Sequence, residues 1–151
     1  MLGIKNMKWN IEKETLFIID ESKINADESS VYNLIVNHFF NNDSNVYITN
    51  NDKLKFVVSY ESFFNNKFDL QRMFIKDFVF IKEDDNDKII EQKFKNTNFN
   101  YLPVIDNNNH LLFELKLNKS NDELWITKSR WDILYKDNDK VAIALNEYTF
   151  K

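Results

Sequence analysis

Glycine, proline and cysteine are almost absent from this chain of 151 residues, which contains one glycine, one proline and no cysteine. Glycine usually makes up about 7% of a protein. Because Gly3 stands at the terminus, the sequence excludes a glycine-rich loop that cradles a phosphate. The absence of cysteine excludes disulfides, thiol catalysis and thiolate metal sites, and is typical of a reducing cytoplasm.

Long apolar runs and an excess of basic residues are missing as well. No stretch approaches about 18 uninterrupted apolar residues, and the first ten residues hold no apolar run of signal length. The formal net charge of −4 and the pI near 5.2 argue against a nucleic-acid surface, which needs clustered Lys and Arg. We therefore expect a cytoplasmic protein that contacts neither nucleic acid nor a membrane.

The chain is rich in the side chains that build a core. Hydrophobic residues make up 43% of it and aromatic residues 15%, including fourteen Phe. This composition predicts one domain or two small interlocked halves. Since glycine is scarce, the turns must be made by Asn and Asp, which tolerate left-handed backbone; such residues cluster at 41–43, 50–52 and 137–139.

One hairpin organises the rest of the sequence. The apolar runs Leu102–Ile105 and Leu111–Leu115 flank an Asp-Asn-Asn-Asn turn, a pattern that predicts strand, tight turn and strand. Pro103 lacks a backbone donor, so we expect it at a strand start or a sheet edge. A weaker copy of this hairpin lies upstream, where Val46–Ile48 and Leu54–Val58 flank a second turn.

Each hairpin comes after a strand and a helix. A short strand at Leu16–Ile19 precedes a helix that begins at Ser29 or Ser30, and the first fourteen residues form a lead-in arm or short helix. A buried strand at Phe78–Ile81 precedes a second helix, whose acidic start at 83–87 suits the positive end of the helix dipole. The unit β-α-β-β thus occurs twice, and an offset of 57 pairs Val46 with Pro103, Phe56 with Phe113, Ser59 with Lys116 and Ser62 with Lys119. Each copy can cover the apolar sheet face of the other.

Shorter elements complete the predicted fold. Residues 59–68 contain a short helix with Phe63 and Phe64 turned inward, and residues 71–77 form a helical turn. The C-terminal runs 124–126, 131–135 and 141–145 predict strands, the last two joined in a hairpin. The predicted division is an arm at 1–15, a first repeat at 16–68, a second repeat at 69–120 and a C-terminal β extension at 121–151. The fold class is α/β (α+β).

The second repeat resembles a CBS motif, the cystathionine β-synthase-type domain. The resemblance rests on Leu102-Pro103-Val104-Ile105-Asp106 together with residues 78–91, and residues 27–62 form the weaker copy. The family usually places two β-α-β-β-α units in tandem as a Bateman module, and here the resemblance covers residues 16–120. It implies a CBS-pair-like module that binds AMP, ADP, ATP or S-adenosylmethionine between its repeats and regulates an attached or partner enzyme.

The ligand signature of that family is degenerate in this chain. The family opens its third strand with a glycine, followed by two apolar residues, a Thr or Ser, two spacers and an Asp that grips the ribose. In the first repeat Phe56 replaces the glycine, Ser59 keeps the hydroxyl and Ser62 replaces the Asp. Loss of the carboxylate removes charge-assisted hydrogen bonds to the ribose.

In the second repeat glycine, hydroxyl and acid are all replaced, by Phe113, Lys116 and Lys119. The two lysines can meet a phosphate or an acidic partner as point charges, although solubility is the commoner role of surface lysines. The resemblance therefore implies five candidate ligand-binding residues: Ser59, Ser62, Leu102, Lys116 and Lys119.

No catalytic or metal constellation stands out. Serines are scattered and none lies in a nucleophile elbow, so we expect no enzyme activity. His38 falls on an apolar helical face and His110 in a turn, which favours packing and solvation over metal binding. The acidic run 83–87 lacks the ligand alternation and glycine of a calcium loop, which favours a solvated helix start.

Two functions remain open. The first is a non-catalytic regulatory or assembly module, dimerising through its repeats, that senses an adenine nucleotide and controls an attached or partner enzyme. The second is a small acidic immunity- or inhibitor-type protein that occludes a basic partner. Its support is the −4 charge and the aromatic residues Tyr60, Trp125, Trp131 and Tyr135. Such residues are enriched at interfaces, but burial under the C-terminal hairpin explains them equally well.

Overall fold

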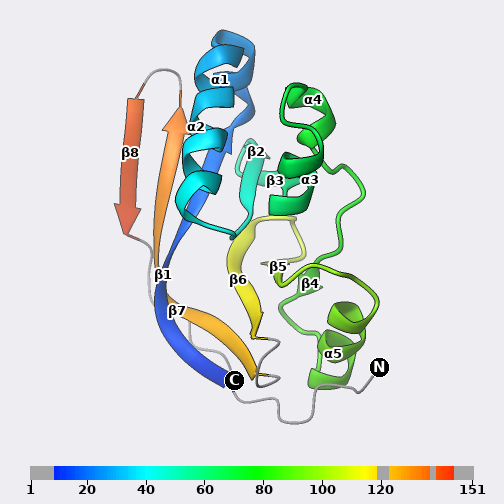
Figure 1. Cartoon of the computed structure of the whole chain (residues 1–151). Coiled ribbons are helices and arrows are strands. Elements are labelled where there is room, and N and C mark those ends of the chain that lie inside the picture. The colour runs from blue at the N-terminus through cyan, green and yellow to red at the C-terminus, as the bar shows by residue number, and fades with distance from the viewer. Residues whose placement is uncertain (1–8, 119–122, 137–138, 145–151) are drawn as a thin grey trace. The chain divides into compact units, whose positions relative to one another are not determined.

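The computed structural model describes the backbone of residues 9–118, 123–136 and 139–144 and the side chains of residues 16–117. The chain forms two compact units (Figure 1). The first-repeat unit contains Thr15–Phe78 and Trp131–Ala144, and the second-repeat unit is centred on Val79–Arg130. The continuous part of the first-repeat unit ends at Phe78, and the division of the repeats after residue 68 stays a prediction.

The first-repeat unit holds a three-stranded sheet in the order β3-β2-β1, in which β2 is parallel to β1 and antiparallel to β3. A parallel pair needs a long crossover connection, and α1 and α2 form it. The elements of this unit are the part of β1 (Trp9–Asp20) from Thr15 on, α1 (Glu21–Ala26), α2 (Glu28–Asn41), β2 (Val46–Asn50), β3 (Lys53–Val58), α3 (Tyr60–Asn65) and α4 (Leu70–Met73).

Helix α2 covers the core of this unit. Its residues Val31, Ile35 and Phe39 recur at four-residue spacing on one face and are all buried, which is the pattern of an amphipathic helix. They belong to an apolar cluster to which the strands and α4 also contribute, through Ile19, Val46, Ile48, Val58, Leu70 and Met73.

The second-repeat unit repeats this plan with a shorter helix. Its sheet has the order β4-β5-β6, in which β5 is parallel to β4 and antiparallel to β6. The elements are β4 (Ile81–Lys82), α5 (Asp87–Lys95), β5 (Tyr101–Ile105) and β6 (Leu111–Asn118). Ile90 and Phe94 of α5 pack on the strands in a second core cluster. The tandem β-α-β-β repeat predicted from the sequence is confirmed.

The strand registers show how the two hairpins correspond. Ile48 pairs with Phe56 immediately before a register shift in the first hairpin, and Val104 pairs with Phe113 immediately before a register shift in the second. Phe113 therefore corresponds to Phe56, at the predicted offset of 57. Val104, however, corresponds to Ile48 at an offset of 56. The prediction that aligned Val46 with Pro103 is wrong by one residue, because the turn of the first hairpin is one residue shorter than that of the second.

Asn and Asp make both turns, as the shortage of glycine predicts. Asn51 and Asp52 join β2 to β3 with φ values of 51° and 64°, the two left-handed residues that a tight type I′ turn requires. In the second hairpin Asn109 has a φ of 65°. There the Asp106 carboxylate accepts hydrogen bonds from the backbone N–H groups of Asn108 and His110, at 2.8 and 2.9 Å.

Pro103 lies within β5 rather than at its start. It pairs with Glu114 of β6, while β4 pairs only with the last two residues of β5, Val104 and Ile105. No β4 residue therefore faces Pro103 in the described ladder, and this part of β5 is a sheet edge on that side. An edge is where a residue without an N–H donor is tolerated.

Several local expectations are wrong. Helix α1 was not predicted, because six residues with a single buried apolar side chain, Ile24, carry no readable period. Strand β1 begins at Trp9, where the sequence indicates an arm or short helix, and β4 is only two residues long, so Phe78–Phe80 lie outside it. Phe63 packs on the core cluster as expected, but Phe64 is 53% exposed.

The C-terminal extension forms the predicted hairpin. Strand β7 (Glu123–Lys136) pairs antiparallel with β8 (Asp139–Ala144), from Trp131 opposite Ala144 to Lys136 opposite Asp139. The sequence indicates two strands before the turn, whereas the structure has one, and the beginning of β7 pairs with β6. Leu145 and the side chains of Trp125, Trp131 and Tyr135 lie outside the described residues.

Candidate functional site

The two candidate serines stand together where β3 passes into α3. Ser59 is the N-cap of α3, and its hydroxyl accepts a hydrogen bond from the Ser62 backbone N–H at 3.0 Å. In return the Ser62 hydroxyl accepts from the Ser59 N–H at 2.9 Å and donates to the Ser59 carbonyl at 3.1 Å. This is a capping box closed by a serine instead of the usual Glu or Gln. Both hydroxyls therefore hold the start of α3.

Phenylalanine fills the two places where the CBS signature has glycine. Phe56 is half-buried and its ring stacks on Phe74, with centroids 5.3 Å apart. Phe113 is completely buried in the core cluster of the second-repeat unit. In each unit the side chain occupies volume that a glycine leaves empty.

Leu102 and Lys116 lie on the neighbouring strands β5 and β6 of the second-repeat unit. Leu102 is 1% exposed and belongs to the core cluster. Lys116 pairs with Tyr101 across the ladder, and its Nζ lies 5.7 Å from the centroid of the Tyr101 ring. Lys119 lies outside the described residues. The structure thus brings Ser59 and Ser62 together, whereas Leu102 and Lys116 pair with Leu115 and Tyr101 and lie on opposite faces of the sheet.

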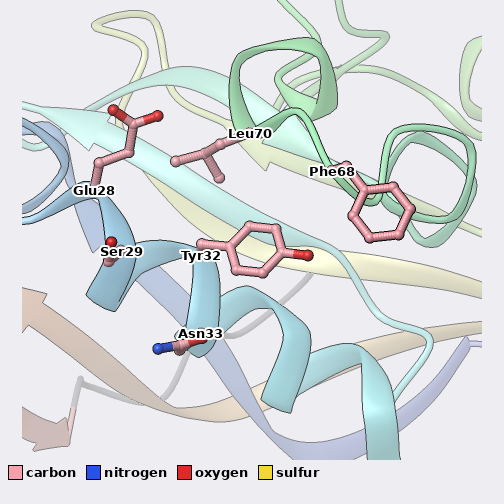
Figure 2. A pocket seen from close by; sticks show the side chains of 6 residues that line it. All are labelled: Glu28, Ser29, Tyr32, Asn33, Phe68 and Leu70. Atoms are coloured by element: carbon pink, nitrogen blue, oxygen red, sulfur yellow. The ribbon is translucent and has the colours of Figure 1, made fainter.

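A pocket of about 440 Å³ lies elsewhere in the first-repeat unit (Figure 2). Its lining comes from the first turns of α2 and from the segment that leads into α4, and consists of Glu28, Ser29, Tyr32, Asn33, Phe68 and Leu70. The Tyr32 hydroxyl donates a hydrogen bond to the Lys67 carbonyl oxygen at 2.5 Å, which ties α2 to that segment. The sequence analysis missed this pocket. Its only sequence signal is that Glu28, Ser29, Tyr32 and Asn33 share one face of a helix.

The N-cap of α2 stands next to this pocket. The Asp27 carboxylate accepts hydrogen bonds from the Ser30 hydroxyl at 2.6 Å and from the Ser30 backbone N–H at 3.1 Å. These bonds, the hydroxyl bond above all, hold the pKa of Asp27 below its ordinary value. Asp27 is therefore anionic at neutral pH. Together with Glu28 it interacts favourably with the positive end of the helix dipole.

His38 is packed inside the first-repeat unit. Its Nε2–H donates to the Ser44 carbonyl at 2.7 Å, and its ring centroid lies 4.3 Å from that of Phe17. In the part of the chain that the structure describes, its Nδ1 has no hydrogen-bond partner. Burial lowers the pKa of His38 and outweighs the hydrogen bond to Ser44, which raises it. The ring is thus a neutral core side chain, the role that the sequence favours.

The remaining metal candidates have structural partners. His110 Nδ1 lies 3.0 Å from the Asp106 carboxylate within the hairpin loop. In the acidic run, Asp85 pairs with Lys93 at 2.7 Å and Asn86 caps α5. Among residues 9–118, 123–136 and 139–144, no three His, Cys, Asp or Glu side chains gather closely enough to hold a metal ion. No helix in these ranges has the length and apolar character needed to cross a membrane.

No protein-family model and no curated protein matches this sequence. Solved structures do match the fold. Over 71% of its length the chain is similar to the cytosolic domain of the Mg²⁺ channel MgtE in complex with ATP, at 15% identity and a TM-score of 0.54. Over 70% it is similar to the soluble part of a magnesium transporter, at 20% identity and a TM-score of 0.50. It spans 44% and 41% of those two chains, less than half of each. The chain therefore has the fold of a CBS-like α/β module.

Proposed function

We propose that this chain is a non-catalytic regulatory module of the CBS type that controls an attached or partner enzyme. The observation that carries the proposal is the tandem β-α-β-β repeat, whose fold is similar to a part of the MgtE cytosolic domain. Among the described residues, the ionisable side chains with shifted pKa values are engaged in caps, turns, ion pairs or packing. These structural roles favour a protein that acts by binding over one that acts by proton transfer.

The sharper form of the proposal is that the module senses an adenine nucleotide or S-adenosylmethionine. Its support is that the MgtE domain was captured in complex with ATP. In this chain Ser59, Ser62 and Lys116 are the polar candidates, whereas Leu102 is 1% exposed and belongs to the core. Because the ribose-gripping carboxylate is absent, the complex loses charge-assisted hydrogen bonds of about 1.5–3 kcal/mol. We therefore expect weaker binding than in a module that keeps this carboxylate.

The test is thermal unfolding of the whole chain with and without AMP, ADP, ATP and S-adenosylmethionine. A ligand at about a hundred times its dissociation constant stabilises the folded state by roughly 2.7 kcal/mol, which raises Tm by several degrees in a chain of this size. Because Ser59→Ala also weakens the α3 cap, the quantity to compare is the rise in Tm on adding ligand. Lys116→Gln tests the phosphate contact, and Lys88→Gln on the exposed face of α5 is its matched control.

A rise with one nucleotide that shrinks in Ser59→Ala and Lys116→Gln, and persists in Lys88→Gln, would support nucleotide sensing. No rise with any ligand would contradict sensing and leave a module that works by protein contact. The proposal also includes a homodimer, which light scattering measures directly. Affinity purification from the native cell tests the partner: a metabolic enzyme supports regulation, whereas a basic toxin or nuclease contradicts it and favours the acidic inhibitor.

A further inference from the structure

Strand β8 is an outer strand with a regular ladder on one side. It pairs with β7 without a register shift, from Trp131 opposite Ala144 to Lys136 opposite Asp139 (Figure 1). In the part of the chain that the structure describes, no strand pairs with the other edge of β8. Such an edge presents a row of backbone N–H and C=O groups that can bind a further strand.

The outermost strands at the other ends of the sheet, β3 and β4, carry features that prevent strand pairing. In β3 the lysines at 53 and 55 are exposed, and Val57 forms two backbone hydrogen bonds with Ile75, at 3.2 and 2.9 Å. Strand β4 is only two residues long, and Pro103 lies in β5 beside it. Lysines, covering segments, short strands and proline are the usual protection of a sheet edge.

Most of β8 lacks this protection. Residues 141–144 are Val, Ala, Ile and Ala, which carry no charge and include neither proline nor glycine. Two residues separate Lys136 from Asp139, and the pair that closes so short a connection is a hydrogen-bonded one. Because hydrogen-bonded pairs alternate along an antiparallel ladder, the odd-numbered residues of β8 bond to β7. The residues whose backbone groups face the open edge are Lys140, Ala142 and Ala144.

We propose that β8 pairs antiparallel with β8 of a second copy of this chain, across a two-fold axis at Ala142. This register sets Ala142 opposite Ala142 of the partner subunit and Lys140 opposite Ala144 of the partner subunit, so the outward backbone groups of both strands can bond to each other. Val141 then stands opposite Ile143 of the partner subunit, an aliphatic cross-strand pair. The pairing rests on the homodimer of the proposed function and names its surface, but it does not require a nucleotide.

A second copy is the occupant that the sequence of β8 favours. Across a two-fold axis the same strand lies on both sides, so it must be complementary to itself. The residue at the axis meets its own copy, and Ala142 brings neither charge nor bulk there. The register also sets no two like charges of residues 140–144 opposite each other, which would weaken the pair. Because β3 and β4 are protected, the pairing closes at two copies instead of continuing into a fibre.

The test combines sedimentation velocity of the whole chain, from micromolar to millimolar concentration, with amide hydrogen exchange measured by NMR. We expect a dimer in which the amides of Ala142 and Ala144 become protected as the concentration rises. The amides of Val141 and Ile143, which bond to β7, should be protected at every concentration. Ala142→Lys places like charges opposite each other at the axis and should weaken dimerisation about fivefold or more. Ala26→Lys adds the same charge at the exposed end of α1 and should leave dimerisation unchanged.

The outcomes separate this surface from the proposed function. A dimer that is equally stable in Ala142→Lys, or whose Ala142 amide exchanges freely, would overturn the β8 surface and leave the homodimer of the proposed function standing. A chain that stays monomeric at millimolar concentration would overturn both, while the rise in Tm with a nucleotide is measured independently. Protection of the Ala142 amide in the monomer would mean that one chain covers its own edge, and would also overturn the pairing. The exchange pattern of the wild type needs no variant, so it decides the question even where Ala142→Lys disturbs the hairpin.

Discussion

The two units share the order β-α-β-β but differ at the ends of their third strands. In the first-repeat unit β3 ends at Val58, and Ser59 closes a capping box that starts α3. At the corresponding place in the second-repeat unit, Lys116 lies inside β6, which continues to Asn118. Lysine has no acceptor oxygen with which to cap a helix. The β-α-β-β order is thus the same in both units. After the hairpin, however, the chain enters a helix at Ser59 in the first-repeat unit and continues as a strand at Lys116 in the second.

The surfaces of the two units differ as well. Among the residues whose side chains are described, the large exposed hydrophobic residues are Phe40, Tyr60, Phe64 and Phe68 in the first-repeat unit and Ile89 in the second. The first-repeat unit has three helices beyond the common plan, α1, α3 and α4. Three of its four exposed aromatic residues lie on α3 or just after it. Helix α3 and the turn after it therefore carry most of the exposed aromatic surface of this unit.

The largest expected effect comes from the paired phenylalanines. Phe113→Ala should lower the free energy of unfolding by about 3–5 kcal/mol, because Phe113 is fully buried and its removal leaves a cavity. Phe56→Ala, at the corresponding position, should cost roughly half as much, since Phe56 is half-buried and stacks on one ring. Urea unfolding of both variants measures the difference. Equal losses would mean that the two positions are equivalent in packing as well as in register.

A smaller effect is expected at the exits of the two hairpins. Ser59→Ala should cost about 1 kcal/mol, within the range of 0.5–2 kcal/mol for a lost N-cap, while Ser59→Thr should restore most of that loss because it keeps the hydroxyl. Lys116→Ala should change stability by no more than about 0.5 kcal/mol. Denaturant unfolding tests all three variants. A Lys116→Ala loss as large as that of Ser59→Ala would contradict the contrast between the two exits.

The smallest effect concerns pH and arises in the core of the first-repeat unit. Burial lowers the pKa of His38 in the folded state, so the unfolded chain binds a proton that the folded chain does not. Stability is therefore complete above the ordinary pKa of 6.5 and declines as the pH falls below it. At pH 6 the loss is at most about 0.8 kcal/mol. The stability difference between the wild type and His38→Gln, which cannot titrate, should change with pH in this window. A constant difference would contradict the prediction.

Much of the fold was predictable because the signals are local. The Asx turns result from the shortage of glycine, and the apolar runs on both sides of them are long enough to be strands. Helices α2 and α5 show four-residue apolar spacing at Val31, Ile35 and Phe39 and at Ile90 and Phe94. Helix α1 and the length of β7 were missed, because a six-residue helix has no period to detect and polar residues interrupt a long strand without ending it.

The candidate ligand residues were predictable only as a set of positions. The resemblance selects Ser59, Ser62, Leu102 and Lys116 from their spacing, but spacing does not say what a side chain contacts. The structure places the two serine hydroxyls in a helix cap and Leu102 in a core. The pocket was missed because Phe68 and Leu70 come from a segment more than thirty residues after Glu28.

The sequence by itself determined the repeated β-α-β-β order, the Asx turns and the offset of 57 between Phe56 and Phe113, since these depend on neighbours along the chain. Only the tertiary structure decided which of those phenylalanines is fully buried, that the first hairpin has the shorter turn, and that Tyr32 and Phe68 line one pocket with Glu28. Burial and register depend on contacts between strands and helices that are distant in the sequence, and a local sequence pattern does not specify those contacts.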